Sequence, residues 1–339
     1  MPADATVTNW FVDHRTYLWG LAYRITGSAP DADDVLQETF VRAWERAPSR
    51  LDDPRRWLTK VAVNVARDVL RRRKRRRYIG PWLPTPVATD ERDPPSFEPV
   101  VEGETLEGRF DLIESASLAF LQALEALTPT QRAVLLLRDV FDYTAAEVAA
   151  VLDLSAGNVR IIHLRARRLM SAYERRRVTA SAISRARTGD TLRHFLELLA
   201  RGDVRGIERM LAADVRAVTD GGGEYTASRR PVLGVARVAQ FFARLAASRP
   251  GNKRVTIRSV NAFPAALFEF TLSPGRRAPK LLLALNVDEA GRITNLWVIA
   301  SSEKLGVLAR PPQLAFASIS RADGGRGNGA VSSLRSSAR

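Results

Sequence analysis

DADDVLQETFVRAWE, residues 31–45, has the clearest helical pattern of the sequence. Its apolar side chains recur at i, i+3, i+4, i+7 and i+8, which is the spacing of one face of an α-helix. Acids in the first turn suit the positive end of the helix dipole. We predict an amphipathic helix whose apolar stripe packs inward and whose acidic face stays exposed. The stripe comprises Ala32, Val35, Leu36, Thr39, Phe40, Ala43 and Trp44.

Helical patterning continues on both sides of this stretch. It runs from about Asn9, and a second long helix is predicted over residues 55–76, ending in the basic block RRRKRRR at residues 71–77. Residues 79–115 break the pattern with six prolines, and residues 90–114 carry nine acids against two arginines. This composition predicts an extended acidic linker.

A helix-turn-helix is predicted after the linker. TPTQ at residues 128–131 offers an N-cap, a proline at the first helical position and a glutamine three residues after the cap. TAAE at residues 144–147 is a second capping box, which opens a short helix. Residues 153–154 make a turn, and Ser155 caps an arginine-rich helix that runs to about Glu174. The core-facing stripe of that helix is predicted to be Val159, Ile162, Ala166 and Leu169.

The character of the chain changes after residue 185. Helices are predicted at residues 191–211 and near residues 235–247, among five β-rich runs that we expect to form an antiparallel sheet. This order predicts an α+β domain at residues 185–310, followed by a flexible tail rich in Gly, Ser and Arg at residues 311–339. The runs are residues 215–219, 254–260, 266–272, 281–287 and 293–300.

Composition narrows the class of protein. A length of 339 residues predicts two or three domains, and the lack of cysteine excludes disulfides and thiolate metal sites. No signal-like start and no apolar run of about 18 residues is present, so we expect a cytoplasmic protein without membrane contact. The net charge of +15 is uneven. Residues 1–177 hold 27 Lys and Arg against 25 acids, whereas residues 185–310 hold 21 against 11.

Taken in order, these parts resemble bacterial RNA polymerase sigma factors of the extracytoplasmic-function (ECF) type. DVLQE at residues 34–38 is similar to the segment of region 2 that docks on polymerase. WLTKVAVNVARD at residues 57–68, with the arginine block, is similar to the part that opens the promoter at its minus-10 element. LTPTQR at residues 127–132 and the helix-turn-helix resemble region 4, which reads the minus-35 element. The implied bounds are 1–78 for region 2, 79–115 for the linker and 116–177 for region 4.

The resemblance implies three partners: core RNA polymerase, double-stranded promoter DNA and its melted strand. Docking on polymerase needs exposed hydrogen-bond acceptors. Contact with DNA needs Arg and Lys for the phosphates and polar side chains for the base edges. The docking set could instead be an ordinary solvated helix face, and the basic run a solvated helix end. The docking set is Asp34, Gln37 and Glu38. The minus-10 set is Lys60, Asn64, Arg67, Arg71, Arg72 and Arg73. The helix-turn-helix set is Ser155, Asn158, Arg160 and Ile161 for base edges, with Arg165, Arg167 and Arg168 for phosphates.

The second helix of the helix-turn-helix departs from the commoner sigma pattern. Residues 161–164 read IIHL where a polar or basic residue often stands. We expect His163 to be partly buried or to face phosphate. The chain's three histidines are scattered, so we predict no metal site and no cofactor.

The C-terminal domain resembles the cone-shaped SnoaL-like cyclases, and with WLPTP at residues 82–86 it matches an ECF subgroup with such a fused domain. That resemblance implies a domain that contacts the sigma core and tunes its activity, without a dedicated anti-sigma partner. Glu224 stands where the subgroup is usually basic, and Ser301-Ser302-Glu303 replaces a usual Asn-Pro-Asp. The implied regulatory contacts are Asp220, Gly221, Gly222, Gly223, Glu303, Lys304 and Leu305.

Two alternatives stay open. The chain could be a free-standing DNA-binding regulator, or a SnoaL-like enzyme tethered to DNA-binding modules. Asp220 beside a glycine turn is the one candidate for proton transfer, but no second acid or base is placed with it, so we predict no enzyme. The glycines serve better as a turn that needs positive φ. A cone-shaped fold also encloses a pocket, which leaves a small-molecule ligand open.

Overall fold

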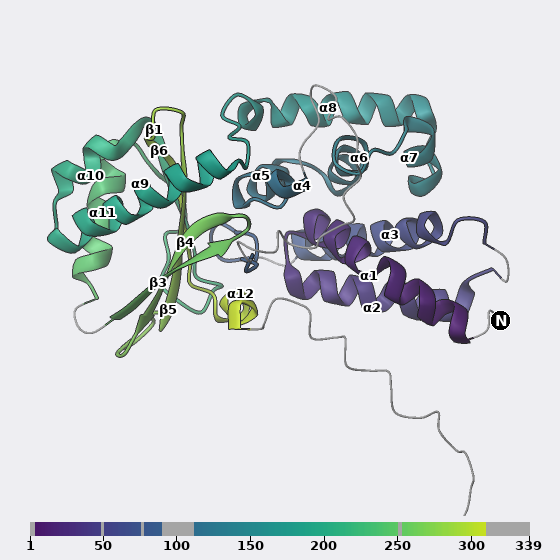
Figure 1. Ribbon diagram of the computed structural model, residues 1–339, viewed down its shortest axis with the longest axis horizontal. Helices are drawn as coiled ribbons and strands as arrows, with labels where there is room; N and C mark the ends of the chain where they lie inside the picture. Colours follow the sequence, from purple (N-terminus) through teal and green to yellow (C-terminus); the bar gives the residue numbers. More distant parts are fainter. Residues whose placement is uncertain (1–3, 49–50, 76–77, 90–111, 250–252, 310–339) are drawn as a thin grey trace, which may run out of the picture.

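The computed structural model describes residues 4–48, 51–75, 78–89, 112–249 and 253–309 (Figure 1). A helical part and an α+β part lie side by side, with the short segment 78–89 between them. The acidic stretch at residues 90–111 and the predicted tail at residues 311–339 lie outside the described residues.

Three helices form the first module: α1 (Asp4–Thr26), α2 (Ala29–Arg46) and α3 (Pro54–Arg75). The helix predicted at residues 31–45 is confirmed as α2, and Ser28 caps it by accepting a hydrogen bond from the Asp31 N–H. The apolar stripe is buried or partly buried except at Trp44, which is 46% exposed. That part of the prediction was wrong because the helical repeat carries Trp44 about 100° past the buried Ala43.

The second module contains the helix-turn-helix, and both predicted capping boxes form, at Thr128 and Thr144. Val159 and Ala166 are buried as predicted, but Leu169 is 50% exposed and Met170 takes the core position, one turn after Ala166. The elements are α4 (Leu112–Ser115), α5 (Leu118–Ala123), the 3₁₀ turn η1 (Leu124–Ala126), α6 (Pro129–Asp139), α7 (Ala145–Leu152) and α8 (Ala156–Glu174).

The two helical modules share one hydrophobic core. A single cluster of buried side chains extends from Val7 in α1 to Met170 in α8. Within it α3 packs against α6 and α7, and α1 also packs against α6. The modules therefore lie in contact.

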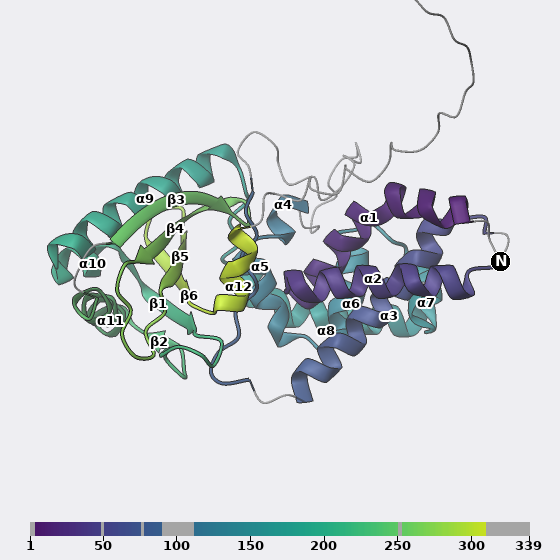
Figure 2. The same cartoon turned by 90° about the horizontal axis from the view of Figure 1, so that it is seen from below.

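The C-terminal domain is built on a six-stranded, strongly curved sheet (Figure 2). Its order is β2-β1-β6-β5-β4-β3, and β1 pairs with β6 in parallel while the other pairs are antiparallel. The prediction of a purely antiparallel sheet was wrong, because the first and last long strands meet in the middle of the sheet. The strands are β1 (Leu211–Asp220), β2 (Val232–Leu233), β3 (Lys253–Val260), β4 (Phe263–Phe270), β5 (Lys280–Val287) and β6 (Ile293–Ile299).

The helices of this domain differ from the prediction at two places: the first predicted helix is divided, and the short helix α12 with the turn after it was not predicted. The helical stretch predicted at residues 191–211 begins earlier and is divided at Gly202, whose φ of 68° ends the first helix. The helix predicted near residues 235–247 is confirmed as α11. The helices are α9 (Ala182–Arg201), α10 (Val204–Met210), α11 (Val235–Ala247) and α12 (Ser302–Gly306), with a final 3₁₀ turn, η2 (Val307–Ala309).

Each face of the sheet has its own apolar cluster. Helices α9, α10 and α11 cover one face, with Phe195 and Phe242 fully buried against it. On the other face, Leu83 of the segment 78–89, Leu118 of α5 and Leu305 of α12 pack together against the strands. The sheet thus joins the helical modules through a packed apolar interface.

Candidate functional site

The predicted docking set lies on one side of α2. Asp34 and Gln37 are exposed, and Glu38 is half-buried and forms an ion pair with Arg42 at 2.7 Å. Asp34 and Glu38 stand one turn apart and line an open cavity of about 570 Å³, which Glu303 of α12 also lines. The acidic face of α2 therefore borders the C-terminal domain.

Residues of the predicted minus-10 set lie along α3, and several contact the second module. Lys60 Nζ is 2.6 Å from Asp153 Oδ1 in the turn between α7 and α8. Arg67 Nη2 donates to Thr130 Oγ1 at the start of α6, at 3.1 Å. These cationic side chains are engaged by the helix-turn-helix module. Of the other members, Asn64 accepts from Arg67, Arg71 pairs with Asp68, and Arg72 is exposed.

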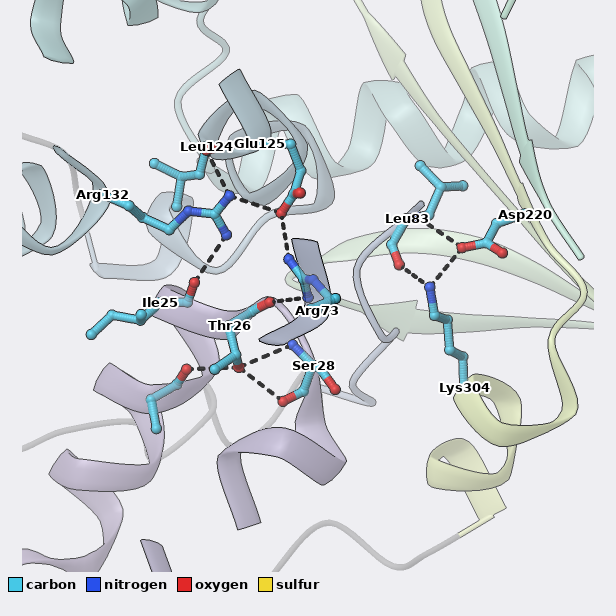
Figure 3. A network of polar contacts seen from close by, with 11 residues as sticks. Ile25, Thr26, Ser28, Arg73, Leu83, Leu124, Glu125, Arg132, Asp220 and Lys304 are labelled. Atoms are coloured by element: carbon cyan, nitrogen blue, oxygen red, sulfur yellow. Dashed lines mark hydrogen bonds and ion pairs between the residues drawn. The ribbon is translucent and has the colours of Figure 1, made fainter. Parts of the chain in front are cut away.

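Arg73 belongs to a charged cluster where the two helical modules meet (Figure 3). Its guanidinium donates to the carbonyl oxygen of Thr26 at 2.6 Å and to the Glu125 carboxylate at 3.0 Å. The same Glu125 oxygen accepts from the buried Arg132 at 2.9 Å. Burial lowers the pKa of Arg132, and the Glu125 carboxylate opposes that shift. One carboxylate thus joins an arginine of each module.

Members of the helix-turn-helix set divide between an inner and an outer side of α8. Ser155 caps the helix by accepting from the Asn158 N–H at 3.2 Å. Arg167 and His163 both turn toward the buried Asp139, at 3.2 Å and 2.7 Å. Arg167, expected at phosphate, is therefore tied to α6, and His163 is partly buried. The exposed members are Ser155, Asn158, Arg160, Ile161, Arg165 and Arg168.

Several of the predicted regulatory contacts come together around Asp220, the fully buried last residue of β1 (Figure 3). Asp220 Oδ2 accepts from the Leu83 N–H at 2.8 Å and from Lys304 Nζ at 2.6 Å. Asp220 Oδ1 accepts from the Tyr78 hydroxyl at 2.5 Å and from the Gly222 N–H at 2.9 Å. Lys304 also donates to the Leu83 carbonyl oxygen at 2.5 Å. We name these residues the Asp220 cluster.

Burial controls the charge states in the Asp220 cluster. It lowers the pKa of Lys304, and the carboxylate of Asp220 opposes that shift. Burial and the same carboxylate raise the pKa of Tyr78 far above its usual value, so Tyr78 stays a protonated donor. The segment 78–89 is therefore held to the C-terminal domain by hydrogen bonds that Tyr78 and the Leu83 N–H donate to the Asp220 carboxylate.

Trp82 links this cluster to the first module. The Arg73 guanidinium lies 3.7 Å from the centroid of its ring, and Lys304 Nζ lies 4.3 Å from the same centroid. The ring also covers Gly27, whose φ is 68°. A Cβ at Gly27 would lie 2.7 Å from the indole. One aromatic ring thus contacts a cation of α3, a cation of α12 and the turn between α1 and α2.

Comparison with known proteins bears on both parts of the chain. Residues 10–76 match the family model of sigma-70 region 2, and residues 117–170 match that of sigma-70 region 4. The ECF RNA polymerase sigma factor SigJ of Mycobacterium tuberculosis is 31% identical over 299 residues, which span 86% of this chain and 90% of that protein. The chain belongs to the ECF sigma factors.

A second relative and a solved structure give the same family. SigG of Mycobacterium tuberculosis is 31% identical over 277 residues, covering 75% of this chain and 70% of that protein. The crystal structure of SigJ superposes with a TM-score of 0.66 at 27% identity and covers 88% of this chain and 98% of that one. The match therefore includes the α+β domain. In the described part of the sigma factor, no helix is long and apolar enough to cross a membrane.

Sequence reasoning found some residues of the junction and missed others. Gly222 and Gly223 have φ values of 65° and 78°, which confirms the predicted turn. Tyr78 and the backbone of Leu83 were missed, and so was Asn261. The Asn261 side chain is buried at the end of β3 and donates to Tyr23 and to the Ala116 carbonyl oxygen, each at 2.7 Å. Leu83 lies in the WLPTP motif, but that motif does not indicate its partner, and no local pattern marks Tyr78 or Asn261, since their contacts join distant parts of the chain.

Proposed function

We propose that this sigma factor binds core RNA polymerase in the cytoplasm and directs promoter-specific initiation, without catalytic activity of its own. In this proposal residues 1–78 dock on polymerase and open the minus-10 element, residues 116–177 read the minus-35 element, and residues 185–310 regulate both in cis. The family membership and the exposure of Asp34, Gln37, Arg160 and Arg168 support these roles.

We infer a closed form from the distance that the two DNA-reading modules must span. Elements named minus-10 and minus-35 lie about 25 base pairs apart, which is about 85 Å of B-DNA. Here Lys60 of α3 and Asp153 of the helix-turn-helix are in direct contact at 2.6 Å. With the two modules in contact, the protein cannot read the minus-10 and the minus-35 elements at the same time. We therefore take it as a closed form that must open on the promoter.

The Asp220 cluster is the single observation that carries the regulatory proposal. The segment 78–89 leads into the connection between the two helical modules, and the cluster fixes Leu83 of that segment to β1 and α12. Since Trp82 in the same segment contacts Arg73, a hold on the segment is also a hold on α3. We propose that the C-terminal domain stabilises the closed form in this way.

Transcription reconstituted with core polymerase and the full chain tests the proposal. Asp220→Asn weakens the acceptor for Lys304 and is expected to raise specific transcripts several-fold, because the open form becomes more populated. Asp190→Asn, which changes an exposed pair with Arg193 on α9, is the matched control and should leave transcription unchanged. If the wild-type chain directs no specific transcription start, the proposed function is wrong. If Asp220→Asn yields as much specific transcript as the wild type, the regulatory part is wrong.

The alternative enzyme has little support from the contacts of Asp220. Its carboxylate accepts four hydrogen bonds from groups of the chain and is fully buried, which leaves no free acceptor for a substrate proton. The alternative of a free-standing regulator predicts that Asp34→Lys and Gln37→Lys leave function intact. We expect them instead to abolish co-purification with core polymerase while DNA binding by α8 persists.

A further inference from the structure

One face of α8 points directly away from the core. Gly157, Ile161, Leu164 and Arg168 recur at i, i+4, i+7 and i+11, opposite the buried Val159, Ala166 and Met170. Ile161 is 51% exposed and Leu164 is 53% exposed. The outermost line of this helix is therefore apolar at its centre.

Cations surround that apolar line. Arg160, Arg165 and Arg168 are exposed, and none of them has an ion-pair partner among the described residues. Arg167 differs, because it is turned inward to Asp139. The outward face thus has the composition of a surface that meets phosphates at its edges and something apolar at its middle.

The first turn of α8 leaves the approach to Ile161 open. Gly157, one turn before it, has no side chain, and apart from its chain neighbours and the helix's own backbone no atom lies within 4 Å of the place where its Cβ would be. Ile161 is therefore the first bulky side chain on the outward face. Its β-branch also restricts χ1 in a helix, so little side-chain freedom is lost on contact.

These observations decide what Ile161 can read in a major groove. Its side chain has no hydrogen-bond donor or acceptor, and the 5-methyl group of thymine is the apolar group that base pairs present there. We propose that Ile161 recognises the 5-methyl group of a thymine in the minus-35 element, with Leu164 packing beside it. This inference rests on the proposed function and adds a specificity determinant to it.

Removal of that methyl group alone tests the inference. A minus-35 sequence is first selected from a randomised library with the full chain and core polymerase. Each thymine of the selected element is then replaced singly by deoxyuridine, which differs only in the missing methyl group. At one position the wild-type holoenzyme is expected to lose about 3- to 5-fold in affinity, the effect of one buried methyl group. Ile161→Ala should show no difference between thymine and uracil there.

Two controls complete the experiment. Leu169→Ala removes an equally exposed apolar side chain from another side of α8 and should keep the wild-type sensitivity. Ile161→Val keeps a β-branched apolar group and should retain most of it. A selected element without thymine, a scan without effect, or an effect that persists in Ile161→Ala would each overturn the inference. If selection yields no element and no specific start, the proposed function itself fails.

Discussion

Asp220 and Lys304 form a buried ion pair in which the carboxylate oxygen and the ammonium nitrogen are 2.6 Å apart. The two side chains are 0% and 8% exposed, and they come from β1 and α12, which enclose the end of the sheet. Because the pair also holds the backbone of Leu83, its stability and the position of the segment 78–89 are coupled.

Removing one partner of this pair should be costly. Lys304→Met leaves the Asp220 carboxylate buried without its cation and is expected to lower the free energy of unfolding by about 3–5 kcal/mol. The double variant Asp220→Asn/Lys304→Met should recover part of that loss, because neither charge is then left alone. Denaturant unfolding of the wild type, the two single variants and the double variant measures this difference in stability.

The control for that cycle is Lys280→Met, which breaks a half-exposed pair with Glu269. It should cost less than about 1 kcal/mol. Equal losses for Lys280→Met and Lys304→Met would contradict the assigned importance of the Asp220 cluster.

Breaking the contact between α3 and the helix-turn-helix should favour DNA binding. Asp153→Asn removes the charge opposite Lys60 without touching a proposed DNA-binding side chain, and Asn tolerates the φ of 54° at this position. We expect tighter binding of a melted minus-10 strand by up to about 5-fold, since pairs this exposed contribute about 1 kcal/mol at most. Fluorescence anisotropy gives the Kd. Asp68→Asn is the control, because it also removes one negative charge but frees Arg71 within α3 and leaves the contact with the helix-turn-helix intact. A gain in affinity that is specific to Asp153→Asn therefore reports opening of the closed form.

Gly27 should tolerate no side chain. Gly27→Ala adds strain at a φ of 68° and also places a Cβ 2.7 Å from the Trp82 ring. Gly202→Ala is a matched control, because Gly202 has the same φ and open space around it. The strain alone is expected to cost about 1–2 kcal/mol, so Gly202→Ala should lower the unfolding temperature by a few degrees. Gly27→Ala should lower it further and shift the tryptophan fluorescence. Equal effects would mean that Trp82 moves aside freely.

The capping box of α7 predicts a dependence on pH. The backbone N–H and hydroxyl of Thr144 donate to Glu147 and hold the pKa of that carboxyl below its usual 4.5. Its contribution to stability is therefore complete above pH 4.5 and is lost as pH falls through the lowered pKa. Glu147→Gln keeps an acceptor that does not titrate, so its unfolding midpoint should fall less steeply between about pH 5 and about pH 3. Parallel curves for the two proteins would contradict this assignment.

Those parts of the fold that depend on residues close in sequence were predictable. The helices over residues 31–45 and 156–174 follow from 3.6-residue periodicity, and Thr128 and Thr144 mark helix starts because their caps involve residues only three positions away. The parallel pairing of β1 with β6 was missed because strand partners about 80 residues apart leave no local trace. Leu169 was misplaced because a core position next to Met170 is decided by tertiary packing.

For the candidate site, too, local motifs were predictable and long-range contacts were not. Asp220 and Lys304 were named from motifs, but their partners Tyr78 and Leu83 lie more than 130 residues from Asp220 along the chain. The engagement of Lys60 by Asp153 was equally hidden, since it depends on how two separate modules pack.

In the proposed closed form, the hydrophobic core shared by the two helical modules adds a free-energy cost to promoter recognition. Apolar surface between α3 and α6 must meet water, or a new partner, whenever the modules separate. In this proposal the apparent affinity for the promoter is the intrinsic affinity multiplied by the fraction of molecules already separated, and every 1.4 kcal/mol of closure lowers it about tenfold. A change in the apolar part of the α3–α6 contact is therefore expected to alter the fraction of the protein that can read a promoter, although it touches neither polymerase nor DNA.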